Sequence, residues 1–435
     1  MTYRLRILIT LSILAAFSLP AAAQSNDYIV RFQQGTPKAA RAAAAARHNA
    51  TLRHNYSIVD AIAVTINNEN ARRALAAEAG VQAITPDYPV FASQSLNAAD
   101  RASEKGKGKP GGDPTPPPPP PAQITPAGVL RVGAPTATSS GKGIDVAIVD
   151  TGIDFNHPDL AVADGYNALD GTSNCQDDNG HGTHVAGIVA ALDNAIDVRG
   201  VAPRASLHCV KVLNAQGQGS WSGVIDGLDW LWNDGTPRVR VVNMSLGGPG
   251  SDTDSEFRQA IARLHAAGVI VVVAAGNDPS LDVAQQVPAA YESLVVTVAS
   301  TTAMDGVSGC NITVKQDSAS YFTSDGMGVT ISAPGDERED IVKRGVQCYL
   351  EALGILSLKL GGGTTRMSGT SMATPHVTGI VARLLEATNG PHTFDEIKAY
   401  FNSSPGADRI GAAPLDSRAS SYTFDFDREG IAVIR

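Results

Sequence analysis

The sequence from Ala122 onward alternates between short runs rich in valine and isoleucine and longer stretches with helical spacing of apolar residues. The runs are "IDVAIVD" (144–150), "SLHCVKVL" (206–213), "VRVVNMSL" (239–246), "VIVVVAA" (269–275) and "LVVTVAS" (294–300). Between them lie the helical patterns "HVAGIVAAL", "WSGVIDGLDWLW" and "DSEFRQAIARLHAAG". Such strands predict an α/β fold, a parallel sheet covered by helices on both faces. In these sheets the reactive groups lie at the carboxyl ends of the strands.

The first 121 residues divide into three segments of different composition. Residues 1–23 carry two arginines before an apolar run and end in small residues, which is typical of a secretory signal peptide, with a retained anchor as the alternative. Residues 24–92 read as βαββαβ, which predicts a small ferredoxin-like α+β domain. Residues 93–121 contain "EKGKGKPGGDPTPPPPPP" and predict a linker with a stiff polyproline end. The main domain is therefore expected at 122–435.

Charge is distributed unevenly between these parts. Residues 24–121 carry a net charge of +3, whereas residues 122–435 carry −14. An acidic main domain argues against nucleic acid as a partner and offers no basic face to an anionic membrane. No apolar run after the signal approaches the ~20 residues of a membrane span. We therefore expect an exported, soluble, monomeric protein.

Three reactive side chains stand where regular elements begin or end. Asp150 ends the first strand, His181 lies between two glycines at a helix start, and Ser371 opens the helix in "GTSMATPHVTGIVARLLEA". Each also has an ordinary interpretation, as a turn residue, a histidine near a cap, or an N-cap serine. Together they supply the orienting carboxylate, the base and the nucleophile of a covalent hydrolase.

Two glycine-rich strand ends extend this arrangement. Asn277 follows the strand at 269–275, where its amide can donate to a developing oxyanion. "VVNMSLGG" ends at 245–248 in an edge that an extended peptide can join by strand addition. An ordinary turn is the alternative interpretation of both.

Five motifs in chain order, "DTGID", "HGTHVAG", "SLGG", "AAGN" and "GTSMATPH", resemble those of the subtilisin-like serine proteases. The resemblance covers residues 122 to about 400, and residues 28–92 resemble the inhibitory propeptide of that family. It implies that Ser371 attacks the scissile carbonyl, that His181 transfers the proton, and that Asp150 holds the imidazole. It also implies an oxyanion hole formed by Asn277 and the backbone N–H of Ser371. The expected protein is a secreted serine endopeptidase made as a self-processing zymogen.

The resemblance assigns the substrate cleft as well. Ser245, Leu246 and Gly247 would pair with the substrate backbone, and Ala274, Ala275 and Gly276 would form the opposite wall of the first pocket. Gln286 is a further candidate for the pocket lining. Self-cleavage would fall between Ala92 and Leu96. Segments 303–325 and 335–363 are longer than the usual connections of the family, which leaves substrate preference open.

The segment "LDNAIDV" (192–198) resembles a calcium-binding loop of that family. Oxygen ligands with one carboxylate suit Ca²⁺, whereas a plain surface turn is the alternative. The matching ligands are Gln123, Asp159, Leu192, Asn194, Ile196 and Val198.

Four cysteines in an exported chain predict two disulfides, with three possible connectivities. We expect Cys175–Cys209 and Cys310–Cys348, because the second pair would join the two long segments.

Two other function classes compete with the protease. One is a metal hydrolase that uses His181, His184 and either Cys175 or a nearby carboxylate, although its His-x-x-His lacks the glutamate of a zincin helix. The other is an inactive, protease-like binding protein, although all four catalytic positions are intact.

Overall fold

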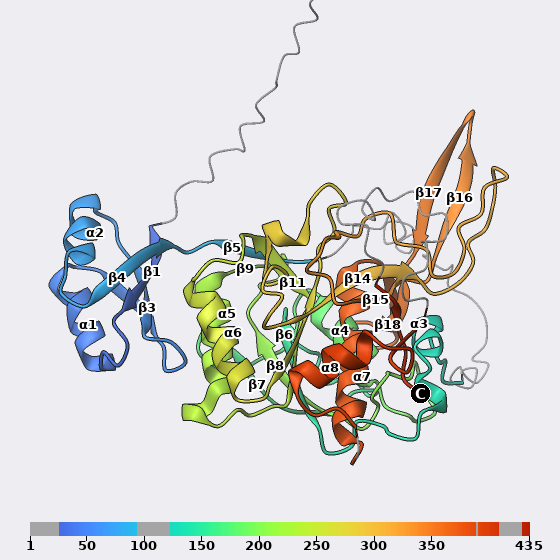
Figure 1. Ribbon diagram of the computed structural model, residues 1–435, viewed down its shortest axis with the longest axis horizontal. Coiled ribbons are helices and arrows are strands. Elements are labelled where there is room, and N and C mark those ends of the chain that lie inside the picture. Colours follow the sequence, from blue (N-terminus) through green and yellow to red (C-terminus); the bar gives the residue numbers. More distant parts are fainter. Residues whose placement is uncertain (1–25, 94–121, 389, 409–428) are drawn as a thin grey trace, which may run out of the picture.

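The structure is a computed structural model that describes residues 26–93, 122–388, 390–408 and 429–435 (Figure 1). The expected signal peptide and the linker beyond Ser93 lie outside the described residues. The chain forms a small N-terminal module, at one end of the molecule, and a larger domain. Within the described ranges, no helix is both long and apolar enough to cross a membrane.

The N-terminal module has the βαββαβ order that its sequence predicts. Its elements are β1 (Asp27–Phe32), α1 (Lys38–Arg47), β2 (Thr51–Asn55), β3 (Ala61–Thr65), α2 (Glu69–Ala76) and β4 (Val81–Pro86). They form an antiparallel sheet of order β2-β3-β1-β4, with both helices packed on one face. The hairpin of β2 and β3 begins at Thr51, and Tyr56 lies in the loop between the two strands. Its buried hydroxyl donates to the carbonyl of Ser222 in the larger domain (3.0 Å).

The larger domain is built on the predicted parallel sheet. The strand order is β20-β21-β15-β14-β12-β10-β6-β8-β7. Among these strands, β20 pairs antiparallel with β21 and the other pairs are parallel. All five apolar runs form strands, whereas β7, with the polar sequence "VADGYN", and the strands β15, β20 and β21 were not predicted. The strands are β6 (Asp145–Asp150), β7 (Val162–Asn167), β8 (Ser206–Lys211), β10 (Val241–Met244), β12 (Ile270–Ala274), β14 (Val296–Thr302), β15 (Ile331–Asp336), β20 (Ala407–Asp408) and β21 (Ile431–Ala432).

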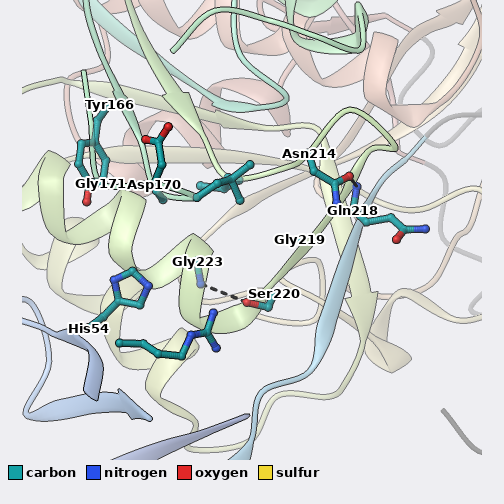
Figure 2. Close-up of a pocket in the computed structure, with 13 residues that line it drawn as sticks. His54, Tyr166, Asp170, Gly171, Asn214, Gln218, Gly219, Ser220 and Gly223 are labelled. Atoms are coloured by element: carbon teal, nitrogen blue, oxygen red, sulfur yellow. Dashed lines mark hydrogen bonds between the residues drawn. The ribbon is translucent and has the colours of Figure 1, made fainter. Parts of the chain in front are cut away.

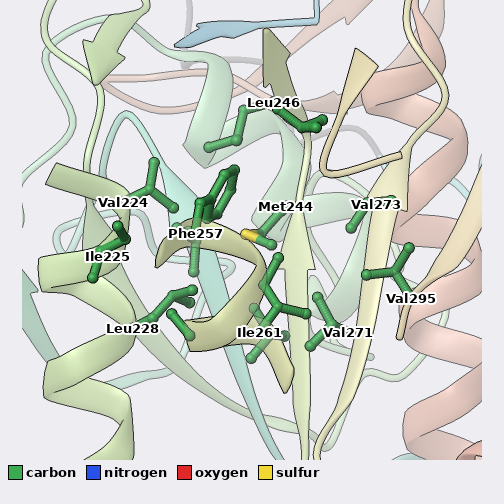
Figure 3. Close-up of a cluster of buried hydrophobic side chains, with 14 of the residues drawn as sticks. Val224, Ile225, Leu228, Met244, Leu246, Phe257, Ile261, Val271, Val273 and Val295 are labelled. Carbon is green, nitrogen blue, oxygen red and sulfur yellow. The ribbon is translucent and has the colours of Figure 1, made fainter. Parts of the chain in front are cut away.

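Helices cover both faces of this sheet, as the continuous apolar strands predict. They are α4 (His181–Ala190) and α7 (Thr370–Glu386) on one face, and α5 (Trp221–Trp232) and α6 (Glu256–Ala266) on the other. Alternate residues of β6 divide between the two cores. Val146 and Ile148 pack with α4 and α7, whereas Ala147 and Val149 pack with α5 and α6. Figure 3 shows the second core, where Phe257 of α6 lies among aliphatic side chains of the sheet.

Smaller elements surround the carboxyl edge of the sheet. A four-stranded sheet of order β13-β11-β5-β9 includes β5 from the N-terminal module, and a long hairpin of β16 and β17 projects from the body (Figure 1). These elements are β5 (Pro89–Ala92), β9 (Gln218–Ser220), β11 (Leu246–Pro249), β13 (Gln286–Val287), β16 (Arg338–Arg344), β17 (Gln347–Leu353), β18 (Ile355–Leu358) and β19 (Thr364–Met367). The remaining helices are α3 (Ala127–Arg131), η2 (Ala134–Thr136), η3 (Asn233–Gly235), η4 (Val283–Gln285) and α8 (Phe394–Phe401).

Two disulfides form with the predicted pairing. Cys175–Cys209 joins the loop before α4 to β8, and Cys310–Cys348 fixes β17 to the segment that follows β14. The two long segments, 303–325 and 335–363, are therefore linked covalently, beside the carboxyl end of β15.

Candidate active site

The carboxyl edge of the sheet places Asp150 beside His181. Asp150 is the last residue of β6, and His181 is the first residue of α4. Nδ1 of His181 lies 2.6 Å from Oδ1 of Asp150, and both side chains are fully buried. The same carboxylate oxygen accepts the N–H of Thr151 (2.7 Å). The carboxylate fixes the orientation of the imidazole, and Nε2 of His181 has no hydrogen-bond partner among the described residues.

A second buried carboxylate, Asp177, connects the residue after Asp150 with the first turn of α4. Its Oδ1 accepts the hydroxyl of Thr151 (2.9 Å) and the N–H of Gly180 (3.0 Å). Its Oδ2 accepts the N–H (3.0 Å) and the hydroxyl (2.6 Å) of Thr183. Asp177 was not predicted as a site residue. The available signal was an acidic residue just before a helix, where free N–H groups donate hydrogen bonds to a carboxylate.

Ser371 lies in the first turn of α7, one residue after the helix begins. The N-cap is Gly369, so the interpretation of Ser371 as an N-cap is wrong. The buried Oγ of Ser371 donates to the carbonyl of Ser245 (3.0 Å). The Oγ of Ser245 donates in turn to the carbonyl of Ser371 (2.9 Å), which lacks its helical partner because Pro375 has no N–H. Ser245 therefore stabilises the proline-containing first turns of this helix.

Asn277 follows β12 and faces the start of α7. Its Oδ1 accepts the N–H and the hydroxyl of Thr370, both at 2.9 Å. These bonds orient the amide, and its buried Nδ2 has no partner among the described residues. An unpaired donor beside a helix N-terminus is suited to stabilise an oxyanion.

The strand β5 lies in the groove between β9 and β11, so that a segment of the chain itself occupies the predicted site of strand addition (Figure 1). Phe91 pairs antiparallel with Gln218 on one side and with Gly247 on the other. The N–H of Ser93 then donates to the carbonyl of Ser245 (3.2 Å). The segment Ser245–Gly247 thus pairs with an extended backbone, as expected of a substrate-binding edge.

A pocket of about 450 Å³ opens beside the end of β5. Gln286 covers Gly276 closely, since a Cβ added to that glycine would lie 2.4 Å from the Gln286 Oε1. The Gln286 Nε2 donates to the Oγ of Ser324 (2.9 Å). Ala274 and Ala275 are buried in the core and do not line this pocket. Its lining residues are Phe91, Ala92, Ser93, Gly247, Gly248, Pro249, Gly276, Asn277, Asp278, Leu281, Gln285 and Gln286.

A larger pocket of about 720 Å³ lies between the N-terminal module and the larger domain (Figure 2). His54 of the module reaches toward α5, where its Nδ1 lies 3.0 Å from Oδ1 of Asp226. Tyr166 of β7 donates to the other oxygen of Asp226 (2.7 Å). Both bodies contribute to the walls, so this pocket is part of their interface and is separate from Ser371.

The six residues expected to bind calcium meet around the amide of Gln123. Its Nε2 lies 2.6 Å from Leu192 O, and 3.1 Å from Asn194 Oδ1, Ile196 O and Val198 O. An amide nitrogen has only two hydrogens, so it cannot donate to all four oxygens. Asp159 lies 2.7 Å from the Asn194 Nδ2, and burial raises the pKa of this carboxyl to about 6. An oxygen cage with one carboxylate fits a hard cation such as Ca²⁺.

Two of the ligands named for the metal-hydrolase alternative are engaged in other contacts. Cys175 is bonded to Cys209 and is not available as a thiolate ligand. His184 faces the core, with its Nε2 3.1 Å from the carbonyl of Ile355, and burial lowers its pKa to about 3.

The fold and this edge of the sheet define a class of protein. The domain is parallel α/β and places an aspartate, a histidine and a serine at one edge of its sheet, in the chain order known from subtilisin. The model of the subtilase family, peptidase S8, matches residues 141–412, and the chain belongs to this family.

Relatives and a solved structure agree with that class. Subtilisin DY of Bacillus licheniformis is 37% identical over 269 residues, which cover 61% of this chain and 85% of the relative. Alkaline elastase YaB of Bacillus sp. (strain YaB) is 39% identical, with 60% of each chain covered. The crystal structure of a cold adapted subtilisin-like serine proteinase gives a TM-score of 0.53 at 31% identity, covering 69% of this chain and 91% of that one. The chain is thus a subtilisin-like serine endopeptidase.

Proposed function

We propose that this endopeptidase cleaves proteins and peptides through an acyl-enzyme on Ser371. The observation that carries the proposal is the 2.6 Å pair of Asp150 and His181 at the same edge of the sheet as the serine. The unpaired Nδ2 of Asn277 and the helix N-terminus at Ser371 support an oxyanion site beside it.

Each proposed step uses a group described above. Ser371 turns its hydroxyl from the carbonyl of Ser245 toward Nε2 of His181, which is free to accept the proton. Oγ attacks the scissile carbonyl carbon, and the resulting oxyanion accepts hydrogen bonds from Asn277 and the Ser371 N–H. His181 returns the proton to the leaving amine, and water then hydrolyses the ester with His181 as base. Asp150 stabilises the imidazolium during both steps.

We also propose that the protein is made as an exported zymogen, with residues 24–92 as its inhibitor and folding aid. The occupied groove supports inhibition, since β5 and a substrate strand cannot both pair with β11. The pattern of residues 1–23 supports export. The net charge of −14 on residues 122–435 favours a monomer that binds neither nucleic acid nor membranes.

Calcium is proposed for the cage around Gln123. Carbonyl oxygens of Leu192, Ile196 and Val198, with the side chains of Gln123, Asn194 and Asp159, would hold it. A bound Ca²⁺ would supply the positive charge that draws these oxygens together. We expect a chelator to accelerate thermal inactivation and added calcium to reverse the effect. An Asp159→Asn variant should respond to neither, whereas an unchanged wild-type rate would contradict the site.

Hydrolysis of unfolded casein tests the main proposal. Ser371→Ala should lose activity by about 10⁶-fold in kcat, the size known for the corresponding serine of subtilisin. Ser403→Ala, which follows α8, is the control and should retain activity. A serine-directed sulfonyl fluoride should abolish wild-type activity, and a zinc chelator should not inhibit directly. A wild-type protein that never hydrolyses casein would favour the inactive, binding alternative.

A further inference from the structure

The way in which β5 is held in the groove places one carbonyl group of the chain beside Ser371. The N–H of Ser93 and the Oγ of Ser371 donate to the same oxygen, the carbonyl of Ser245, at 3.2 and 3.0 Å. A Cβ added to Gly369 would lie 2.7 Å from the carbonyl oxygen of Ser93 and 3.0 Å from the Asn277 Nδ2. The Ser93 carbonyl therefore lies beside both the nucleophile and the unpaired amide donor.

Contacts upstream of Ser93 fix the position of this carbonyl. Asp87, whose side chain is 3% exposed, accepts the N–H (2.8 Å) and the hydroxyl (2.6 Å) of Ser222 at the start of α5. Val90 is fully buried in the same core as Trp221, and its Cγ2 would lie 3.3 Å from a Cβ added to Gly219. The close fit around both residues anchors β5 from its N-terminal side.

The anchors define one register, because side chains alternate along a strand. Pro89 and Phe91, on either side of Val90, are exposed. A slip by one residue would bury one of them in the space of Val90 and would expose the valine. Proline would also bring no N–H to the strand pairing, and the ring of phenylalanine exceeds the space left by valine.

We propose that Asp87 and Val90 act as a ruler, so that self-cleavage cuts the fourth peptide bond after Val90, between Ser93 and Gln94, whatever the side chain at the cut. This proposal rests on the proposed serine mechanism. Ser371 Oγ would bond to the Ser93 carbonyl carbon, the C–N bond to Gln94 would break, and the serine proton would pass through His181 to the new amino group. Water would then release the Ser93 carboxylate.

Inserting one residue distinguishes a cut that is fixed by its distance from Val90 from a cut that is fixed by recognition of the sequence Ser93-Gln94. One alanine is inserted between Ala92 and Ser93 in the full-length precursor, and the products are trapped early with a sulfonyl fluoride for intact-mass measurement. The primary cut is the one whose two products, after subtraction of the sulfonyl group that the inhibitor leaves on Ser371, together weigh as much as the precursor plus one water. The ruler predicts that cleavage moves by one bond, to follow the inserted alanine, so that the new N-terminus is Ser93. Cleavage that stays between Ser93 and Gln94 would overturn the proposal.

Two further precursors keep the test decisive if the insertion prevents folding. Ser93→Ala should be cut at the same bond as the wild type, and deletion of Ala92 should move the cut to follow Gln94. Any other primary bond in these two variants contradicts the ruler. Casein hydrolysis, measured in parallel, separates the outcomes. An active enzyme cut elsewhere refutes only the ruler, whereas an inactive, uncut wild-type precursor refutes the serine mechanism itself.

Discussion

The strand β5 and the hairpin β16–β17 flank the start of α7 and are held in opposite ways. β5 is attached by paired backbone groups and the fully buried Val90, without a disulfide to the larger domain. The hairpin follows β15, beside Gly369, and is fixed by the disulfide Cys310–Cys348, while Val346 at its tip is 95% exposed. Reversible burial suits a segment that the proposed mechanism releases, whereas a disulfide suits one that stays.

The largest expected effect is the loss of inhibition when the buried anchor of β5 becomes charged. Val90→Asp in a separately added 24–93 segment would place an unpaired carboxylate in the apolar core. This should cost about 3–5 kcal/mol of binding free energy. Its inhibition constant against casein hydrolysis should rise by more than 100-fold. Phe91→Asp is the matched control, because Phe91 is 42% exposed, and it should change inhibition little. Equal effects of the two changes would show that burial of Val90 does not hold the strand.

The disulfide of the hairpin should contribute to stability rather than to catalysis. Its cysteines are 38 residues apart, which limits the entropic contribution to about 4 kcal/mol. Replacing both by serine in an inactive Ser371→Ala background should lower the thermal midpoint and make the hairpin the first site of proteolysis. In the active enzyme the same pair of changes should leave casein kcat within about twofold. An unchanged midpoint would mean that the hairpin is held by its other contacts.

The main sheet and the reactive side chains at its edge are the parts of the molecule that the sequence predicts best. Runs of valine and isoleucine predict five of the nine strands of the main sheet, because both faces of a parallel sheet are buried. Asp150, His181, Asn277 and Ser371 were identifiable because the chemistry requires these groups beside small residues at element ends. The structure places all four at one edge, and their catalytic roles stay proposals.

Other features depend on tertiary contacts that leave little trace in the sequence. The register of β5 depends on contacts with α5 and two separate strands. The hairpin sequences "REDIVKR" and "QCYLEAL" mix charged and apolar residues without clear alternation. Asp177 was not predicted, because its role arises only when the loop after Asp150 meets the start of α4. Local sequence patterns thus predict secondary-structure elements and reactive side chains. The register of a strand such as β5 and the hydrogen bonds of a residue such as Asp177 depend on contacts that form only on folding.

The base of the hairpin contains a buried carboxyl whose stability effect depends on pH. Glu339 is 1% exposed, and burial raises its pKa to about 7 from a usual value near 4.5. The unfolded chain ionises this group more easily, so its cost to stability grows between pH 4.5 and 7 and reaches about 3 kcal/mol above that range. Glu339→Gln keeps an oxygen acceptor for the N–H of Tyr321, now bonded at 2.8 Å. In the Ser371→Ala background it should raise the thermal midpoint at pH 8 and not at pH 4.5.

A matched carboxyl on the same hairpin tests whether burial is the cause. Glu351 on β17 is 42% exposed at its side chain and pairs with Arg344. Glu351→Gln should give no comparable gain at pH 8, because an exposed carboxylate keeps its hydration. A gain of equal size in both variants would assign the effect to net charge rather than to desolvation.

The smallest expected effect comes from the exposed rim of the interface with the N-terminal module. Arg31 donates to Asp254 Oδ2 at 2.8 Å, but the aspartate side chain is 74% exposed. Exposed pairs contribute about 1 kcal/mol or less, so Asp254→Asn should weaken inhibition by the 24–93 segment by about fivefold at most. The effect should vanish near 1 M salt, where screening shortens the Debye length to about 3 Å. The loss caused by Val90→Asp should persist at that salt concentration, because solvent ions do not reach a buried site. If salt removed both losses equally, charge attraction rather than burial would hold the module, and the contrast between the two attachments would fail.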